Sequence, residues 1–381
     1  MHCGKKATCM AAAMLAMGIS SPARATNFGA NDLVVYRMGD ADNSAGTQPC
    51  PVYLDEVSKT GSLVGSLPMP TTVSGNQHRL VGTISGIGGM LTRSPDGKFL
   101  AVPGYDDDVN SGVDPTGFST PGTMGIVDQS QNIDTSTILN NSDYYTGAVT
   151  NGNDIWYTNN AGGVFHVIKG QGDITNVSLE DSTNQPKSAL GINIFNNQLY
   201  YATNYNKKIG AGPDRYVGIM SLGSGTPTSG PQNSAELHLD NVGGNSQTGF
   251  IMLNVPGTGA PSGLNTAYIV DPSLTQIEKF SLDGTTWTDD GGIDLGGNGW
   301  GITGEVVGGN VTLYATTDSK VLSFTDATGF GGLVSGSATT LLTAPTGETF
   351  RGIAFAPVPE PSSAMAIVAG AFLLKRRRAA K

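Results

Sequence analysis

The chain has 381 residues, of which only 14% are charged, and its formal net charge at pH 7 is −10. This length is large for one ordinary domain but normal for a large all-β architecture, and the acidic balance excludes a nucleic-acid-binding protein. The 54 glycines, together with Asn, Thr and Ser between short apolar runs, are typical of many short strands joined by tight turns.

The first 25 residues predict a secretory signal. A pair of lysines precedes an apolar stretch, and Ala23 and Ala25 form the small-residue pattern of a cleavage site. We therefore expect residues 1–25 to be removed after Ala25. Cys50 is then the one cysteine left, so we expect a buried free thiol or, as the alternative, a link between chains.

The body, residues 26–357, is more acidic than the whole chain. The signal and the tail beyond the body hold eight of the 21 cations and one of the 31 acids, which leaves the body at −17. A charge of this sign repels nucleic acid and anionic lipid. It suits an exported, soluble surface that attracts cations.

A repeated pattern along the body predicts the fold. Each copy has an apolar strand, a turn of Asn, Asp or Gly, and a second strand rich in aromatic residues. The turn Ser94-Pro95-Asp96-Gly97 is similar to turns of TolB-like and WD-type propellers. Equivalent positions in the second strands recur at intervals of 55, 44, 68 and 46 residues, at Leu100, Ile155, Leu199, Ala267 and Leu313. These intervals have the size of propeller blades.

The two ends of the body predict how the ring closes. Residues 350–356 have the pattern of a first strand with no partners after it, whereas 33–38, 52–57 and 63–67 have the pattern of later strands with nothing before them. Pairing the two groups completes one blade and removes open sheet edges. We therefore expect an all-β fold, a six-bladed β-propeller closed by pairing of the N-terminal strands with the last C-terminal strand. The alternatives are an open β-sandwich or two smaller β domains.

The last residues, 358–381, contain a Pro-Glu-Pro motif, a short apolar run and a basic end. In order these are Val358, Pro359, Glu360, Pro361 and Ser362, the run 364–374, and Lys375, Arg376, Arg377 and Arg378. The prolines keep the motif extended, and the run predicts a short hydrophobic helix of eleven residues, fewer than the ~20 that cross a bilayer. This arrangement resembles the PEP-CTERM sorting tail of Gram-negative bacteria.

The resemblance to the PEP-CTERM tail implies an export route. An exosortase-type processing enzyme would be a partner of the chain. The C-terminal helix would make a transient inner-membrane contact, and the protein would then reach the cell surface or the extracellular space, in association with exopolysaccharide. Either cleavage or retention of the tail is compatible with the sequence.

An acidic loop is the strongest candidate for a metal site. Asp106, Asp108 and Asn110 place oxygen ligands at alternate positions, and Asp114 follows them. This pattern resembles the start of a calcium loop, although Ser111 stands where that loop has glycine. Calcium is therefore the one cofactor that we consider, and the alternative is a solvated acidic loop.

The sequence contains no recognisable catalytic motif, because it lacks a close His pair, a G-x-S-x-G elbow and a phosphate loop. Glu305 and Asp294 are the acids considered for a central channel, since metal-binding carboxylates face the channel in six-bladed lactonases; otherwise they are turn residues. Three Trp residues would stack on sugars or, more economically, pack in the core: Trp156, Trp287 and Trp300.

We therefore assign no catalytic residue and favour a binding function over catalysis. The expected function is that of a cell-surface or extracellular-matrix binding or scaffold protein, with polysaccharide or a matrix protein as the partner. The alternatives are a secreted calcium-dependent propeller hydrolase or lactonase, and a purely structural component of the cell envelope.

Overall fold

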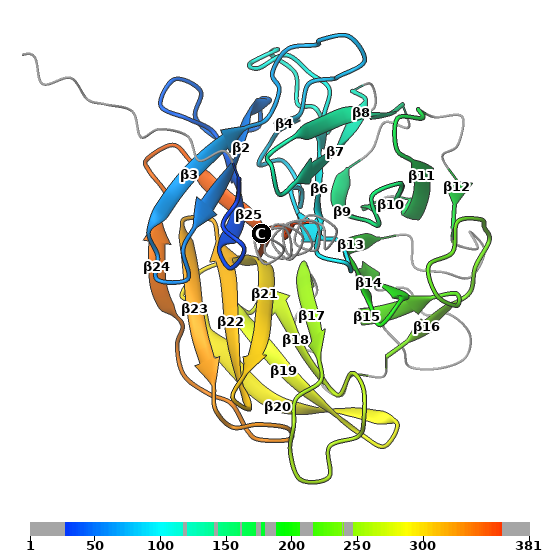
Figure 1. Ribbon diagram of the computed structural model, residues 1–381, viewed down its shortest axis with the longest axis vertical. Coiled ribbons are helices and arrows are strands. Elements are labelled where there is room, and N and C mark those ends of the chain that lie inside the picture. Colours follow the sequence, from blue (N-terminus) through cyan, green and yellow to red (C-terminus); the bar gives the residue numbers. More distant parts are fainter. Residues whose placement is uncertain are drawn as a thin grey trace, which may run out of the picture.

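Every regular element that the structure describes is a β-strand. The computed structural model describes residues 27–116, 120–140, 144–160, 162–172, 177–179, 188–205, 216–237, 239 and 247–359. Their strands form four four-stranded sheets and one nine-stranded sheet. Figure 1 shows these sheets arranged radially around a common axis. The predicted all-β, propeller-like architecture is confirmed.

Each four-stranded sheet is built from consecutive antiparallel strands, with the first strand nearest the axis (Figure 1). The first contains β9 (Tyr145–Thr150), β10 (Asp154–Asn159), β11 (Gly163–Ile168) and β12 (Val177–Ser178). The second contains β13 (Ala189–Phe195), β14 (Gln198–Tyr205), β15 (Tyr216–Leu222) and β16 (Ser234–Glu236). The third contains β17 (Gly249–Leu253), β18 (Thr266–Asp271), β19 (Gln276–Asp283) and β20 (Thr286–Asp294). The fourth contains β21 (Gly299–Val307), β22 (Asn310–Thr317), β23 (Lys320–Asp326) and β24 (Thr339–Thr343).

The nine-stranded sheet joins the two ends of the body. Its strands are β1 (Leu33–Met38), β2 (Cys50–Val57), β3 (Leu63–Pro68), β4 (Val81–Gly82), β5 (Thr92–Arg93), β6 (Phe99–Tyr105), β7 (Gly122–Asp128), β8 (Ile133–Leu139) and β25 (Thr349–Phe355). The order is β25-β1-β2-β4-β6-β7-β8, with β3 on β2 and β5 on β6. In the antiparallel β1–β25 pair, Leu33 lies opposite Phe355 and Met38 lies opposite Thr349. The predicted pairing of the N-terminal strands with the last strand is therefore confirmed.

The turns follow from their residue types. Gly97, at φ +76°, closes the turn between β5 and β6, and its N–H donates to the carbonyl oxygen of Ser94 at 2.8 Å. Asn196 and Asn197, at φ 47° and 61°, connect β13 to β14. Asn and Gly tolerate positive φ better than other residues, and two such residues in succession match the twist of a hairpin.

The core lies between neighbouring sheets. Tyr268 of β18 and Ile277 of β19 belong to the same buried cluster as Leu313 of β22, one sheet further on. Another cluster joins Leu33 of β1 to Val321 of β23. Apolar burial of this kind contributes about 25 cal/mol per Å². The ring is thus closed by side-chain packing as well as by backbone pairing.

Several predicted segments lie outside the described residues. These are the signal peptide with Ala23 and Ala25, the tail from Glu360 with its predicted helix, and the basic end of the chain. Val358 and Pro359 are the last described residues, and the Val358 N–H donates to the carbonyl oxygen of Gly97 at 2.9 Å. Within the part of the chain that is described, no helix is long and apolar enough to span a bilayer.

Candidate functional site

The innermost strands approach one another most closely at a ring of glycines, one on each strand. This glycine ring consists of Gly147 on β9, Gly191 on β13, Gly249 on β17, Gly301 on β21 and Gly352 on β25. A Cβ atom on Gly249 would lie 2.7 Å from the carbonyl oxygen of Trp300, and one on Gly301 would lie 2.8 Å from the Cα of Gly352. Only glycine permits such a close backbone approach.

Met90, which precedes β5, completes the ring. It forms a parallel bridge with Gly147, and its N–H donates to the carbonyl oxygen of Thr146 at 3.0 Å. On its other side, the N–H of Gly352 donates to the carbonyl oxygen of Gly89 at 3.0 Å. Residues 89 and 90 thus connect β9 on one side with β25 on the other.

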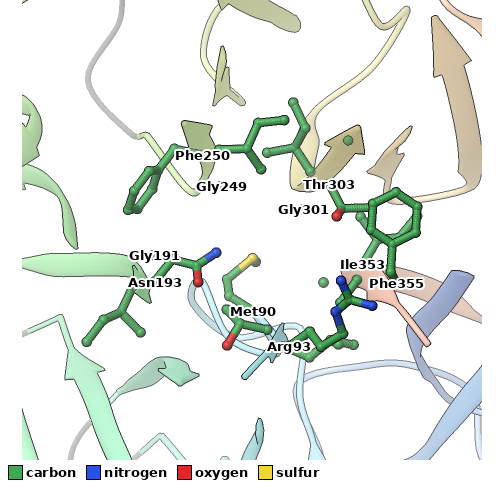
Figure 2. Close-up of a pocket in the computed structure, with 18 of the residues that line it drawn as sticks. Met90, Arg93, Gly191, Asn193, Gly249, Phe250, Gly301, Thr303, Ile353 and Phe355 are labelled. Carbon is green, nitrogen blue, oxygen red and sulfur yellow. The ribbon is translucent and has the colours of Figure 1, made fainter. Parts of the chain in front are cut away.

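A cavity of about 240 Å³ lies on the axis and is lined by β5, β13, β17, β21 and β25 (Figure 2). At ~30 Å³ per water molecule, this is room for roughly eight waters. Met90 and four residues of the glycine ring, Gly191, Gly249, Gly301 and Gly352, form part of its lining, and much of the remainder is apolar. The polar side chains in the lining are those of Thr92, Arg93, Ser94, Asn193, Thr248 and Thr303.

Among the described residues that line the cavity, Arg93 is the one ionisable residue. Its Nη1 donates to the carbonyl oxygen of Ala356 at 3.2 Å, and its guanidinium carbon lies 5.6 Å from the centre of the Phe355 ring. Burial lowers the pKa of Arg93, and attraction to Glu305 offsets this in part. Arginine nevertheless keeps its charge at neutral pH.

Glu305 lies two residues beyond Thr303 on β21, so both side chains lie on the same face of that strand. Its carboxylate pairs with Lys59 Nζ at 2.5 Å. The Lys59 ammonium also lies 5.1 Å from the centre of the Phe355 ring. The predicted channel acid Glu305 is therefore close to the cavity residues but is already paired with a cation.

The other acid considered for the channel, Asp294, lies elsewhere. It is the last residue of β20, the outermost strand of its sheet, and its carboxylate accepts a hydrogen bond from the Gly296 N–H at 2.8 Å. The expectation that Asp294 faces a central channel was wrong. The alternative, a turn residue, agrees with the structure, because Asp294 holds the N–H of Gly296 two residues later.

The acidic loop makes contacts within the protein. Asp106 pairs with both His78 and Arg79, at 3.0 and 2.7 Å, and Asp108 pairs with the same Arg79 at 2.5 Å. Asn110 donates to Asn43, and Asp114 accepts from Thr116, so these two side chains have separate partners. No group of three or more His, Cys, Asp or Glu side chains that could hold a metal ion occurs in the described ranges. The calcium site stays a prediction, and an ion there would have to compete with Arg79.

The three Trp side chains considered for sugar stacking contact other groups of the protein. Trp156 and Trp287 are buried, and Trp156 Nε1 donates to the carbonyl oxygen of Pro227 at 2.6 Å. Trp300 donates to Asp318, and the Arg351 guanidinium carbon lies 4.1 Å from the centre of its ring. For Trp156 and Trp287, core packing is the account that the structure supports.

Sequence reasoning missed the cavity residues. Arg93 stands beside the Ser94-Pro95-Asp96-Gly97 turn but was assigned no role. The glycine ring carries a signal, because a glycine followed by Ile recurs at Gly191, Gly301 and Gly352. That repeat marks the first strand of a sheet, whereas our alignment used the second strands.

The chain is similar in fold to several solved structures, all at low sequence identity. No family model and no curated protein matches the chain. A candidate 6-phosphogluconolactonase from Bacteroides fragilis is 13% identical, with a TM-score of 0.40 over 77% of this chain and 78% of that one. The periplasmic gluconolactonase PpgL of Pseudomonas aeruginosa is 13% identical, with a TM-score of 0.37 over the same shares. The Cps50 (Swd1) β-propeller domain of Myceliophteria thermophila is 9% identical, with a TM-score of 0.40 over 84% and 98% of the two chains. The activities in these names are those of the named proteins.

Proposed function

We propose that the body is a six-bladed propeller. The nine-stranded sheet contains two groups of four strands, β25-β1-β2-β3 and β5-β6-β7-β8, which are joined only through the two-residue strand β4. Counting each group as a blade and adding the four separate sheets gives six. The pairing of β25 with β1 joins the two ends of the body into one of these blades and so closes the ring.

We propose that the axial cavity is a binding site for a small molecule. The observation that carries this proposal is a cavity of about 240 Å³ in which Arg93, Asn193 and Thr303 lie among apolar walls. Ligand sites are typically concave and apolar, with a few polar groups that orient the ligand. The cavity has the size of a small molecule, and a polysaccharide or a matrix protein would have to bind elsewhere on the surface.

The test compares the parent body with a variant whose cavity is filled. Asn193→Trp places an indole in the cavity. Lys169→Trp, in the turn that follows β11, adds the same group at a partly exposed site that does not line the cavity. Thermal unfolding with a collection of small carboxylates, sugars and lactones should show ligands that stabilise the parent and Lys169→Trp but not Asn193→Trp. Stabilisation that is equal in all three proteins would contradict the proposal.

Hydrolysis of a lactone is the second candidate, and the position of Glu305 next to the cavity favours it. In this reaction the Glu305 carboxylate would remove a proton from the water as its oxygen bonds to the carbonyl carbon, and the Arg93 guanidinium would stabilise the negative oxygen that forms there. The ring C–O bond would then break, and the leaving ring oxygen would take the proton from Glu305 to give the hydroxy acid. Glu305 would first have to leave Lys59. The rate of δ-gluconolactone hydrolysis, measured with and without calcium, tests this candidate. We expect the parent to exceed the uncatalysed rate and Glu305→Gln to lose this activity. A parent that does not exceed the uncatalysed rate rejects the candidate.

We further propose that the protein is exported and sorted through its tail. The support is the sequence order of signal, body and Pro-Glu-Pro motif, with the motif starting where the described body ends at Val358 and Pro359. Expression in a Gram-negative host that has an exosortase should give a mature chain beginning at Thr26 that is found at the cell surface or in the medium. Retention of Glu360→Ala/Pro361→Ala in the inner membrane would support recognition of the motif, and unchanged release of that variant would contradict it.

A further inference from the structure

The charge of the axial cavity differs from the charge of the body around it. The mature body is strongly acidic, yet the described residues that line the cavity include no Asp or Glu, and Arg93 is the one ionisable group among them. The nearest acid discussed above, Glu305, is neutralised by Lys59. The described groups at the cavity therefore carry one net positive charge, which is opposite in sign to the net charge of the body.

The Arg93 guanidinium has donor capacity that the protein leaves unused. Arginine has five N–H donors, and the one hydrogen bond that the described residues accept from Arg93 is that to the carbonyl oxygen of Ala356. No carboxylate in the described ranges forms an ion pair with it. The Phe355 ring beside the guanidinium limits its movement and its contact with water.

Asn193 adds donors on another side of the cavity. Its Oδ1 accepts the N–H of Ile194 at 2.9 Å, which directs the carboxamide so that its NH₂ group is the free end. Figure 2 shows the Asn193 and Arg93 side chains on different sides of the cavity, with Met90 between them. Donors of this kind suit the oxygens of an anion or of hydroxyl groups.

We infer that the axial cavity binds a small organic anion, whose carboxylate or phosphate is held by the Arg93 guanidinium and whose remaining polar groups meet Asn193 and Thr303. This inference rests on the proposed small-molecule function and specifies its ligand class. A planar guanidinium binds carboxylate and phosphate oxygens in pairs, which gives both attraction and orientation. A bound anion would also compensate the burial of the Arg93 charge.

Isothermal titration of the body, 26–359, at constant ionic strength tests the inference. The probes are sodium gluconate, inorganic phosphate and neutral sorbitol, and the proteins are the parent, Arg93→Gln, Arg93→Lys and the control Lys169→Gln. We expect at least one of the two anions to bind the parent and Lys169→Gln equally, about tenfold or more weakly in Arg93→Gln, and at an intermediate level in Arg93→Lys. Gluconate alone would indicate a carboxylate ligand, and phosphate alone a phosphate ester.

Three outcomes would overturn the anion inference. They are no binding of either anion, anion binding that Arg93→Gln leaves unchanged, and binding of sorbitol as tight as that of gluconate. Circular dichroism checks that Arg93→Gln is folded. If Arg93→Gln is not folded, the parent is compared with Arg93→Lys, which retains the positive charge. If Asn193→Trp abolishes ligand binding and Arg93→Gln does not, the proposed small-molecule function stands and only the anion inference is rejected. If both variants still bind the ligands, the small-molecule function and the anion inference are both rejected.

Discussion

Gly301 on β21 and Gly352 on β25 meet backbone to backbone, because a Cβ atom on Gly301 would lie only 2.8 Å from the Cα of Gly352. The contact joins the innermost strand of the last four-stranded sheet to the strand that closes the ring on β1. It also forms part of the cavity lining. The same two residues thus help to close the ring and to shape the proposed site.

Gly301→Ala should therefore destabilise the body by about 1–3 kcal/mol, because the added methyl group would push apart two packed strands. Gly297→Ala, in the loop before the same strand, is the matched control, since its Cβ would meet nothing closer than 3.8 Å. Urea unfolding of both variants measures the free energy of unfolding. Equal stabilities for the two variants would show that the backbone contact is not tight.

Cys50 should be unreactive in the folded protein. It is fully buried, and its Sγ–H donates a hydrogen bond to the carbonyl oxygen of Gly82 at 3.4 Å. Burial raises the pKa of Cys50 to about 11, so the thiol stays protonated at pH 8, and the thiolate is the reactive form. We expect a thiol reagent such as DTNB to label the chain only after denaturant is added. Rapid labelling of the native protein, or a dimer that reducing agent dissociates, would restore the alternative of a link between chains.

Lys279 and Asp326 form a fully buried ion pair at 2.8 Å between β19 and β23. Lys279→Met leaves the Asp326 carboxylate without its cation and should destabilise the body by ~3–5 kcal/mol at pH 7. Lys169→Met, which removes a partly exposed lysine 3.6 Å from Asp134, should cost about 0–1 kcal/mol. Urea unfolding of the two variants compares them directly, and similar losses would contradict a special role for the buried pair.

The same pair predicts a pH dependence. Burial acts to raise the pKa of Asp326, but hydrogen bonds from Lys279, Thr328 and Tyr268 outweigh it and lower the pKa below its usual value. A lowered carboxyl pKa contributes stability above the unfolded pKa of about 3.9, and this stability is lost as the pH falls through the native pKa. The difference in stability between the parent and Lys279→Met should shrink from pH 7 toward pH 4, because the variant's Asp326 can take up a proton. A difference independent of pH would mean that lost packing, and not charge, explains the effect.

Arg79 should control calcium binding at the acidic loop, if the loop binds calcium. Its guanidinium pairs with Asp106 and Asp108, two of the predicted ligands. Arg79→Gln removes the competing cation and should raise calcium affinity about threefold to tenfold, whereas Lys169→Gln makes the same change of charge at a distance. Calorimetric titration with calcium measures both. An equal change in the two variants would assign the effect to net charge and not to these ligands.

The order of strands could be predicted from local patterns. Apolar runs that alternate with polar residues, separated by turns such as Asp96-Gly97 and Asn196-Asn197, indicate antiparallel hairpins, because these residues accept the backbone angles of tight turns. The predicted ranges 33–38, 52–57 and 63–67 coincide closely with β1, β2 and β3. The unpartnered pattern at each end then made their pairing the simplest way to close the sheet.

The site could not be predicted in the same way, since it depends on contacts between residues far apart in the chain. Arg93 meets Phe355 and Ala356, more than 250 residues later, and no local period records which strands face the axis together. Glu305 and Asp294 are both isolated acids near glycines in the sequence, yet one lies on an innermost strand and the other on an outermost strand. The pairing of Asp106 with Arg79 likewise follows from how the loops pack, and the composition of the loop alone gives no sign of it.

The sequence by itself thus determined the strand pattern, the all-β class and the closure by β25 on β1, because backbone angles and strand alternation are local properties of residue types. Only the tertiary structure decided that five glycines and Met90 form a ring, that the described residues around the axial cavity include a cation and no acid, and which predicted ligands already have partners. These features arise from the distances between sheets, and such distances are fixed only when all the sheets pack around one axis.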